Sequence, residues 1–341
     1  MKHRPARFRT FEYLLFLLVT LAVMCLCICV GSVNIPLKET VTVLWNALRG
    51  TAQTGSAVSI ILSSRLPRVF CVALSGAALS LCGAAMQGLL KNPLADGSTL
   101  GVSSGASLGA VLAIAFGISF PRLPFGGTVV LAVAFAFLSL LVILGLAYKL
   151  DYSLSTNTII LIGVIFSMFM SSAISVVVTF APEKLKSITF WTMGSLQNSS
   201  YQNALLLLTA FVVFGTVIFF HGRELNAFAV GEDNARHIGV NVRRTKLVIM
   251  VAVSVLIGVC VSVGGTIAFV GLVTPHMIRR IVGPNHRRLL PASAFGGAVF
   301  LLLADLIARI AFNPLELPIG VVTSLVGAVV FIFIFYRTRK G

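Results

Sequence analysis

The sequence is poor in charge, and above all in acidic side chains. Only 11% of its 341 residues are charged, with 10 Asp and Glu against 26 Lys and Arg, whereas soluble domains carry about a quarter charged residues. So few charges do not cover the surface of a water-soluble globule of this size. Together with 57% hydrophobic residues and a mean hydropathy of +1.01, this scarcity predicts a polytopic membrane protein.

Several chemical signals are also missing. The six cysteines lie in apolar stretches without a CxxC pair, and Cys27 points away from the helical face that Cys25 and Cys29 share, so no metal site is predicted. The net charge of +16 comes from short basic clusters between apolar runs, without the aromatic-basic motifs of nucleic-acid binding. There is no HExxH, no nucleophile-base pair and no carboxylate dyad, which argues against an intramembrane enzyme. No ladder of carboxylates or histidines marks an ion path, which argues against a secondary transporter.

Apolar runs long enough to cross a bilayer core of about 30 Å are abundant. Eight are clear, near residues 11–33, 67–90, 98–118, 126–148, 157–180, 201–221, 292–312 and 317–336. The first follows a basic N-terminus like a signal peptide, but it is too long and lacks a small-residue cleavage site. We therefore expect it to be a retained span.

The stretch between Lys246 and Arg279 fits either one long helix or two short ones broken at Gly264-Gly265. Charge decides, because Lys and Arg concentrate in the cytoplasmic loops. Basic clusters flank the stretch on both sides: Arg223, Arg236, Arg243, Arg244 and Lys246 before it, and Arg279, Arg280, Arg287 and Arg288 after it. If both clusters are cytoplasmic, the chain crosses twice between them. The sequence thus predicts an all-α protein with about ten transmembrane helices and both termini in the cytoplasm.

An internal repeat and one polar segment stand out against this background. The pattern IGVxxS occurs at 162–167 and again at 319–324, opening spans at opposite faces of the predicted topology, which favours an inverted repeat of the kind common in transporters. Residues 225–242 are too polar to span and read as two short amphipathic helices around a glycine. A solvated loop is the alternative, but an Ala-rich helix with a glycine-bounded end at Gly239 favours docking onto a partner.

Six motifs follow one another from Arg65 towards the C-terminus. They are RLPRV at 65–69, GAAMQG at 83–88 leading to NPLAD at 92–96, GGTIAFVGLVTPHMIR at 264–279, HRRLLP at 286–291, ADLIAR at 304–309 and ELPIGV at 316–321. In this order and spacing the chain resembles the FecCD-type permeases of binding-protein-dependent ABC importers for iron-siderophores, haem and cobalamin.

The resemblance implies a single permease domain over residues 1–341, with coupling helices at about 225–242, in the bacterial plasma (inner) membrane and surrounded by its lipid. It implies a second permease subunit, either an identical copy or a paralogue, an extracytoplasmic binding protein and two ATPase subunits. No GxxxxGK[ST] occurs in this chain, so ATP and Mg²⁺ are expected in the ATPases, and the chain itself is expected to be neither an enzyme nor a cofactor carrier. The expected cargo is a ferric-siderophore chelate. Haem, cobalamin or an oxyanion are the alternatives, and a secondary transporter is a more distant one.

The resemblance also assigns roles to particular residues. It places the ATPase coupling contacts at Gly231, Glu232, Ala235, Arg236 and Gly239. It places the cytoplasmic gate at Asn92, Leu94, Thr156 and Asn157, although helix capping explains such a turn equally well at Ser155. It places the narrowing of the outer mouth at Trp191 and Met193.

Three arginines on the outer side complete the predicted site. Arg65 and Arg68 bracket a proline at the outer start of a span, and Arg309 emerges on the same side. In the resembling family, matching arginines form salt bridges with carboxylates of the binding protein; anchoring at the membrane surface is the alternative. Asp305 stands four residues before Arg309 and is expected to neutralise it on one helical face; a role in contact with the substrate is the alternative.

Overall fold

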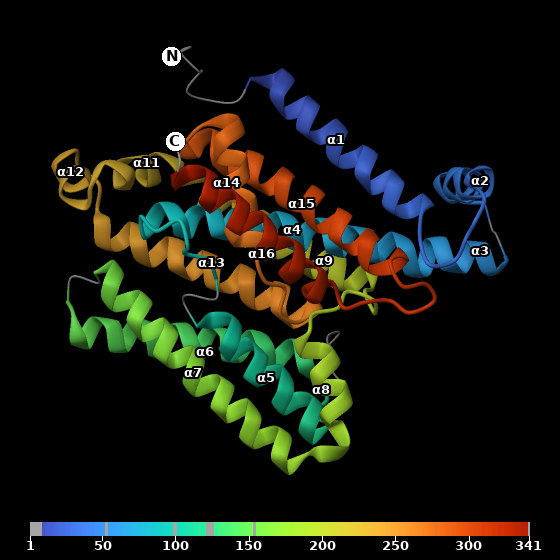
Figure 1. The fold of residues 1–341 in the computed structure, drawn as a ribbon, viewed down its shortest axis with the longest axis horizontal. Helices are drawn as coiled ribbons and strands as arrows, with labels where there is room; N and C mark the ends of the chain where they lie inside the picture. The colour runs from blue at the N-terminus through green and yellow to red at the C-terminus, as the bar shows by residue number, and fades with distance from the viewer. Residues whose placement is uncertain (1–8, 52–53, 98–100, 121–125, 153–154, 340–341) are drawn as a thin grey trace.

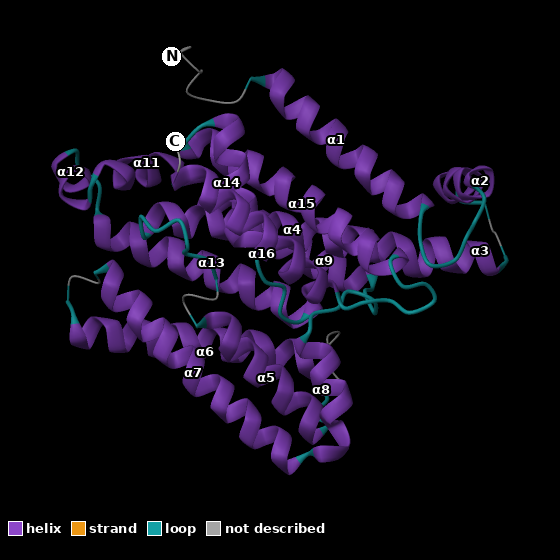
Figure 2. Ribbon diagram, viewed as in Figure 1, coloured by secondary structure: helices purple, strands orange, loops and turns teal. Residues whose placement is uncertain are grey.

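The computed structural model describes residues 9–51, 54–97, 101–120, 126–152 and 155–339, and within these ranges it is helical and contains no strand (Figure 2). The long helices are α1 (Thr10–Cys29), α4 (Leu66–Leu89), α6 (Gly127–Leu150), α7 (Thr156–Phe180), α13 (Val242–Gly264), α15 (His286–Ile310) and α16 (Ile319–Arg339). The shorter ones are α2 (Leu37–Leu48), α5 (Val102–Phe116), α8 (Leu185–Thr192), α11 (Gly222–Val230), α12 (Glu232–His237), α14 (Val270–Val282) and the 3₁₀ turn η2 (Pro182–Lys184).

Two stretches of the chain contain π-helical turns. The segments α3 (Ser56–Val58) and η1 (Ser59–Arg65) lead directly into α4, and α9 (Tyr201–Ala210), η3 (Phe211–Gly215) and α10 (Thr216–Phe220) form one rod. Seven helices of the described chain are long and apolar enough to cross a membrane, and α5 and the described apolar part of α16 are shorter apolar helices. The all-α, polytopic prediction is therefore confirmed.

The stretch that the sequence left ambiguous consists of two helices. Helix α13 ends at Gly264, where Gly265 has φ of 68° and Phe269 has φ of 67° before α14 begins. Such left-handed residues cannot continue a right-handed helix. The start of α13 and the end of α14 both lie on the side of α11 and α12 (Figure 1).

The core is built around α4, which packs against α15, α14, α13 and α9. The close approaches depend on glycine: a Cβ at Gly76 would collide with the backbone of Gly297 in α15, and a Cβ at Gly83 with that of Gly271 in α14. Small residues at such crossings let helices pack closely where lipid supplies no hydrophobic drive for association. A second layer of α5, α6 and α7 is joined to this core through α13 (Figure 1).

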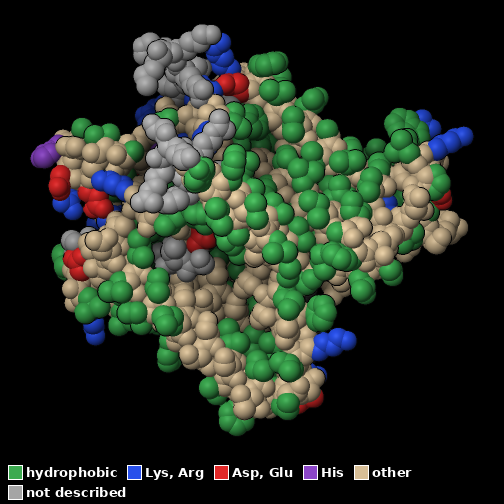
Figure 3. Space-filling view, in the orientation of Figure 1, with side chains coloured by type: hydrophobic (Ala, Val, Ile, Leu, Met, Phe, Trp, Pro, Cys, Tyr) green, Lys and Arg blue, Asp and Glu red, His purple; other side chains and the backbone are tan. Residues whose placement is uncertain are grey.

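The molecule has two polar ends and an apolar middle. Figure 3 shows hydrophobic side chains over the middle of the visible face and charged ones mainly towards its margins. Helices α11 and α12 lie at one end, where α1 begins and α16 ends, and α2 and α3 lie at the other (Figure 1). Helix α2 exposes Leu37, Val41, Trp45 and Leu48 at helical spacing, with Arg49 stacked 4.6 Å above the Trp45 ring. This pattern is typical of a helix lying in the membrane interface.

Candidate functional site

The polar segment expected at 225–242 forms two short helices, α11 and α12, joined at Gly231, whose φ is 143°. Helix α12 ends in a Schellman motif, with the Val240 N–H donating to the Ala235 carbonyl and the Gly239 N–H donating to the Arg236 carbonyl. Gly239 has φ of 89°, which explains why a glycine bounds this end. The segment therefore has a fixed shape, unlike a solvated loop.

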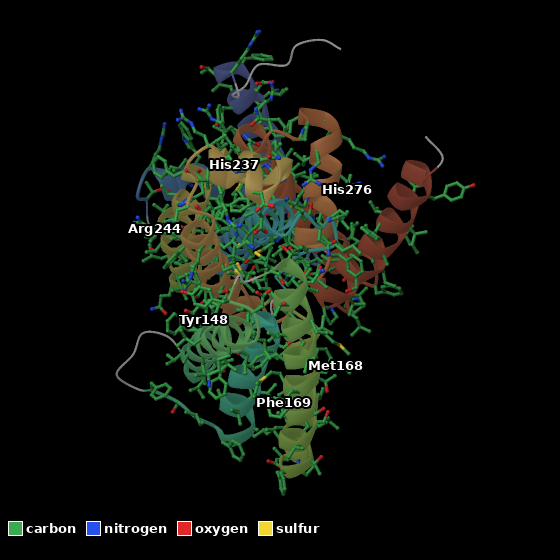
Figure 4. All side chains as sticks on the ribbon, turned by 90° about the vertical axis from the view of Figure 1, so that its left-hand side faces the viewer. Tyr148, Met168, Phe169, His237, Arg244 and His276 are labelled. Carbon is green, nitrogen blue, oxygen red and sulfur yellow. The ribbon has the colours of Figure 1, made fainter. Side chains whose placement is uncertain are left out.

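The α11–α12 segment has one buried face and one exposed face. Phe228 and Ala235 are buried, and Glu232 forms an ion pair of 2.8 Å with the buried Lys246 of α13. These contacts hold the segment on the membrane helices. Ala235, expected to contact an ATPase, is 1% exposed and belongs to the chain's own core, and its coupling contact remains a prediction. The exposed surface is made by Asp233, Arg236, His237 and Gly239 with two apolar residues, Val230 at 73% and Ile238 at 72% exposure. Figure 4 labels His237 in this segment.

The two turns assigned to the cytoplasmic gate lie at this same end of the molecule, where α4 ends and α7 begins (Figure 1). Asn92 closes its turn by accepting a hydrogen bond from the Leu94 N–H at 2.9 Å, and the Leu94 side chain is exposed. Ser155 caps α7 by accepting from the Thr158 N–H, so the capping alternative holds for this residue. Thr156 and Asn157 form the first turn of α7, and their role as a gate remains a prediction.

A cluster beside this turn was not predicted from the sequence. The Arg243 guanidinium, at the start of α13, lies over the rings of Tyr148 and Tyr152 at 4.8 and 4.9 Å and donates to the Tyr152 hydroxyl. Hydrogen bonds with Tyr148 and then with Arg243 lower the pKa of Tyr152. The spacing of four residues between Tyr148 and Tyr152 was the sequence feature that could have indicated this cluster. The cluster connects the α6–α7 turn to the helix that follows α12.

At the opposite end, Arg68 and Arg309 form one buried ion network with Asp305 and Glu316, and Arg65 lies beside them at the end of α1. We call these five residues the outer arginine cluster. Arg68 donates to Asp305 Oδ1 at 3.0 Å and to Glu316 Oε2 at 2.7 Å. Arg309 Nε lies 3.0 Å from Asp305 Oδ2, an ion pair without hydrogen-bond geometry. The expected neutralisation of Arg309 by Asp305 is confirmed.

Other donors of this cluster bind the C-terminal end of α1. The Arg65 guanidinium donates to the carbonyls of Ile28, Cys29 and Val33, and Arg309 donates to those of Cys27 and Val30. The last carbonyls of a helix have no partner within the helix and carry partial negative charge. Two arginines from η1 and α15 thus fix the end of α1.

The exposure of these arginines differs from the expectation. Arg65, Arg68 and Arg309 are 5%, 7% and 3% exposed, whereas both docking onto a partner and anchoring at the membrane surface require outward guanidinium groups. The sequence located the cluster correctly but gave no indication that α1 carbonyls and Glu316 occupy it, because those partners are remote in the chain. Docking through these residues remains a prediction.

The segment assigned to the outer mouth holds three elements together. After Trp191 at the end of α8, Gly194 has φ of 77°. The Ser195 N–H then donates to the Gly264 carbonyl at 2.8 Å, and Thr266 donates to the Thr192 carbonyl. A Cβ at Gly320, near the start of α16, would collide with the Met193 carbonyl. The predicted mouth residues are therefore fixed to the α13–α14 break and to α16.

A cavity of about 310 Å³ borders this junction. Hydroxyl groups dominate its polar lining, which consists of Ser103, Ser104, Ser107, Ser171, Thr192 and Thr266 together with Asp96. In the described part of the chain no group of three His, Cys, Asp or Glu side chains is arranged to hold a metal ion. The described chain thus has a partly exposed polar segment at one end, a buried charge cluster at the other and a small hydroxyl-lined cavity.

A helical bundle with several membrane-spanning helices, a shaped polar segment at one end and a buried charge cluster at the other belongs to the class of polytopic membrane proteins. Comparison with known proteins identifies which: residues 18–337 match the FecCD transport family. The ABC transporter permease YvrB of Bacillus subtilis is 44% identical over 91% of this chain and 89% of its own length. The hemin transport permease HmuU of Yersinia pestis is 36% identical over 95% of both chains, and the iron(3+)-hydroxamate import permease FhuB of Bacillus subtilis is 35% identical over 98% of this chain and 86% of its own.

The fold agrees with these matches. A solved inward-facing metal-chelate-type ABC transporter superimposes with a TM-score of 0.84 at 29% identity, covering 96% of this chain and all of the other. The chain belongs to the FecCD transport family. It is an ABC importer permease and a multi-pass protein of the bacterial inner membrane.

Proposed function

We propose that this chain is one of two permease subunits that form an ATP-driven import pathway for a ferric-siderophore-type chelate. The observation that carries the proposal is the match over nearly the whole chain to a hydroxamate-iron permease and to a solved metal-chelate-type transporter. Haem and cobalamin are the competing cargoes, because permeases for both are similar to this chain. All of these are bulky organic chelates, which separates them from bare ions.

The topology proposed for this single permease domain has ten crossings with both ends of the chain in the cytoplasm. The long and short apolar helices supply nine crossings, and α14 supplies the tenth. The opposite directions of α7 and α16, which carry the two IGVxxS patterns, support an inverted repeat (Figure 1). In this topology α11 and α12 face the cytoplasm and the outer arginine cluster faces the other side.

Energy reaches the pathway through α11–α12 in this proposal. Val230 and Ile238 are exposed among charged residues on a rigid segment, which is the composition of a protein interface. An ATPase subunit that binds ATP and Mg²⁺ is the partner such a segment requires. The Glu232–Lys246 pair, whose lysine is buried, links α12 to α13 and would transmit movement of α12.

The pathway itself is proposed to lie between two permease subunits. The cavity within this chain, about 310 Å³, is at the lower limit of ligand pockets, which are typically about 300–1,000 Å³. Helix α7 exposes Leu161, Ile165, Met168 and Phe169 along one side (Figure 4). These exposed residues are consistent with contact with a second membrane subunit, either an identical copy or a paralogue.

Docking of a binding protein is proposed at the outer arginine cluster. The cluster contains three arginines and two carboxylates, so it keeps one excess positive charge. A carboxylate on the binding protein would have to compete with Glu316, the cluster's more exposed acid. Docking would then require an exchange of ion-pair partners rather than contact with arginines that are already free.

Uptake competition tests the cargo. The chain is reconstituted in proteoliposomes with its ATPase and binding protein, and entry of a ⁵⁵Fe-labelled hydroxamate chelate is measured against excess unlabelled chelate, haemin or cobalamin. Only the unlabelled iron chelate is expected to suppress the signal. No entry of the iron chelate, with entry of radiolabelled haemin or cobalamin under the same conditions, would assign the competing cargo and contradict the proposal.

A further inference from the structure

A groove of about 750 Å³ runs along the outside of the bundle between α1 and the η3–α10 rod. Helices α4 and α15 form its floor, because α1 packs on both of them and η3 and α10 pack on them as well. The floor combines four alanines, Ala73, Ala77, Ala294 and Ala298, with larger apolar residues of the same two helices, Leu74, Leu290, Pro291 and Phe295. Aromatic side chains stand at its sides, with Phe211 and Phe219 in edge contact at 6.3 Å between ring centroids.

The groove has the length of one membrane leaflet. Its lining on α15 extends from His286 to Ala298, and twelve steps along a helix at 1.5 Å each correspond to about 18 Å. Half of a bilayer core of about 30 Å is about 15 Å. The groove therefore begins at the end of α15 near α11 and closes near the middle of the membrane, which suits a lipid acyl chain.

One end of the groove carries positive charge, and the rest is apolar. Arg287 lines that end together with Tyr13, and within the described residues no acidic side chain forms an ion pair with Arg287. The neighbouring Glu12 is taken by Arg288, and the His286 ring is held by Asn226. Helix α11 begins at Gly222, which lies against the aliphatic part of Arg287. An anionic group at this position would face an arginine and the start of a helix.

We propose that this groove binds one anionic phospholipid of the cytoplasmic leaflet, with an acyl chain on the apolar floor and the phosphate at Arg287. The choice of leaflet rests on the topology proposed above. Anionic lipids are enriched on that side, and basic pockets between transmembrane helices bind their headgroups. A zwitterionic lipid would fill the apolar part equally well but would gain less from the unpaired arginine. Because α10 leads directly into α11, the bound lipid would contact the helix that carries the coupling segment.

Native mass spectrometry of the delipidated full-length protein in detergent tests this assignment. The probes are phosphatidylglycerol and phosphatidylcholine with identical acyl chains. The protein is expected to retain one phosphatidylglycerol in preference to phosphatidylcholine. Arg287→Gln is expected to weaken phosphatidylglycerol binding by about tenfold, the effect of losing one charge-assisted hydrogen bond. The matched control Arg244→Gln, an exposed arginine at the start of α13 (Figure 4), is expected to change nothing.

A groove-filling variant and a soluble headgroup complete the test. Ala77→Phe is expected to abolish binding of both lipids while the protein keeps its unfolding temperature. Equal retention of the two lipids by the wild type, or equal effects of Arg287→Gln and Arg244→Gln, would overturn the proposal. Competition by glycerol 3-phosphate at the concentrations that saturate with phosphatidylglycerol would also overturn it, because the site would then recognise a free phosphate. Since no transport is measured, failure here leaves the proposed function untouched.

Discussion

Asp305 lies between Arg68 and Arg309 at the outer end of the bundle and is fully buried. A buried carboxylate of this kind is stable because two guanidinium groups compensate its charge, and they in turn depend on it. The same dependence extends to α1, since Arg309 also holds the carbonyls at its end. At the residue scale, one acidic side chain therefore connects α1, α4 and α15.

Replacing Asp305 by Asn is expected to destabilise the protein by about 3–5 kcal/mol, because it leaves buried arginines without a compensating charge. Asp233→Asn is the matched control, since the Asp233 side chain is 86% exposed and its pair with Arg236 is worth well under about 1 kcal/mol. Unfolding in a mild detergent compares the two. Equal midpoints for the two variants would show that the cluster does not hold this end together.

For the same reason, replacing Arg65 and Arg68 by acidic residues would affect the stability of this protein as well as docking of the binding protein. Each guanidinium is bonded inside the protein, so reversal removes structural contacts before any partner is added. Loss of docking in such a variant is interpretable only if its unfolding midpoint is unchanged. Glu316→Gln is the better probe of partner exchange because Glu316 lies at the rim of the cluster.

At the scale of single elements, α12 carries a residue that packs into the core and is followed by one that is exposed. Ala235 faces inward, and Ile238 faces outward just beyond the helix end. Ala235→Asp would bury a charge in this chain's own core, which costs folding stability. Substitution at Ile238 leaves the core contacts of Ala235 intact and changes only the exposed surface that a partner would contact.

Ile238→Asp is therefore expected to leave the unfolding midpoint within about 0.5 kcal/mol of the wild type but to reduce transport per ATP hydrolysed several-fold. Ile238→Leu is expected to transport normally. Ala235→Asp is expected to lower the unfolding midpoint itself. Transport and ATPase stimulation are measured on the reconstituted complex. Normal coupling in Ile238→Asp would place the ATPase contact elsewhere.

The elements also show what the sequence can predict. Long apolar runs gave the spans, and charge on both sides of 246–279 indicated the break that Gly265 makes, because each signal is local. Helix α2 was missed since its twelve residues are amphipathic and neither long nor apolar enough to register as a span. The inward position of Ala235 and the burial of Arg65 depend on α13 and α1, which are neighbours only in the folded chain.

At the scale of the whole molecule, the two polar ends are linked by helices that run between them. Helix α13 begins beside α12 and ends at the Gly264–Gly265 break, where the mouth segment and α16 converge. In the proposed coupling, a shift of α12 on its Glu232–Lys246 pair would reach the mouth segment through α13. This arrangement suits rocking of bundles about a pathway, as alternating access requires.

The most direct test of this account is whether transport by the chain depends on ATP hydrolysis by a separate subunit. Proteoliposomes are prepared with the permease alone and with the permease, its ATPase and its binding protein, and ⁵⁵Fe-chelate uptake is followed with ATP, with a non-hydrolysable analogue and with imposed proton or sodium gradients. The account predicts uptake only in the complete assembly with ATP, whatever the gradient. Gradient-driven uptake by the permease alone would contradict it and identify a secondary transporter.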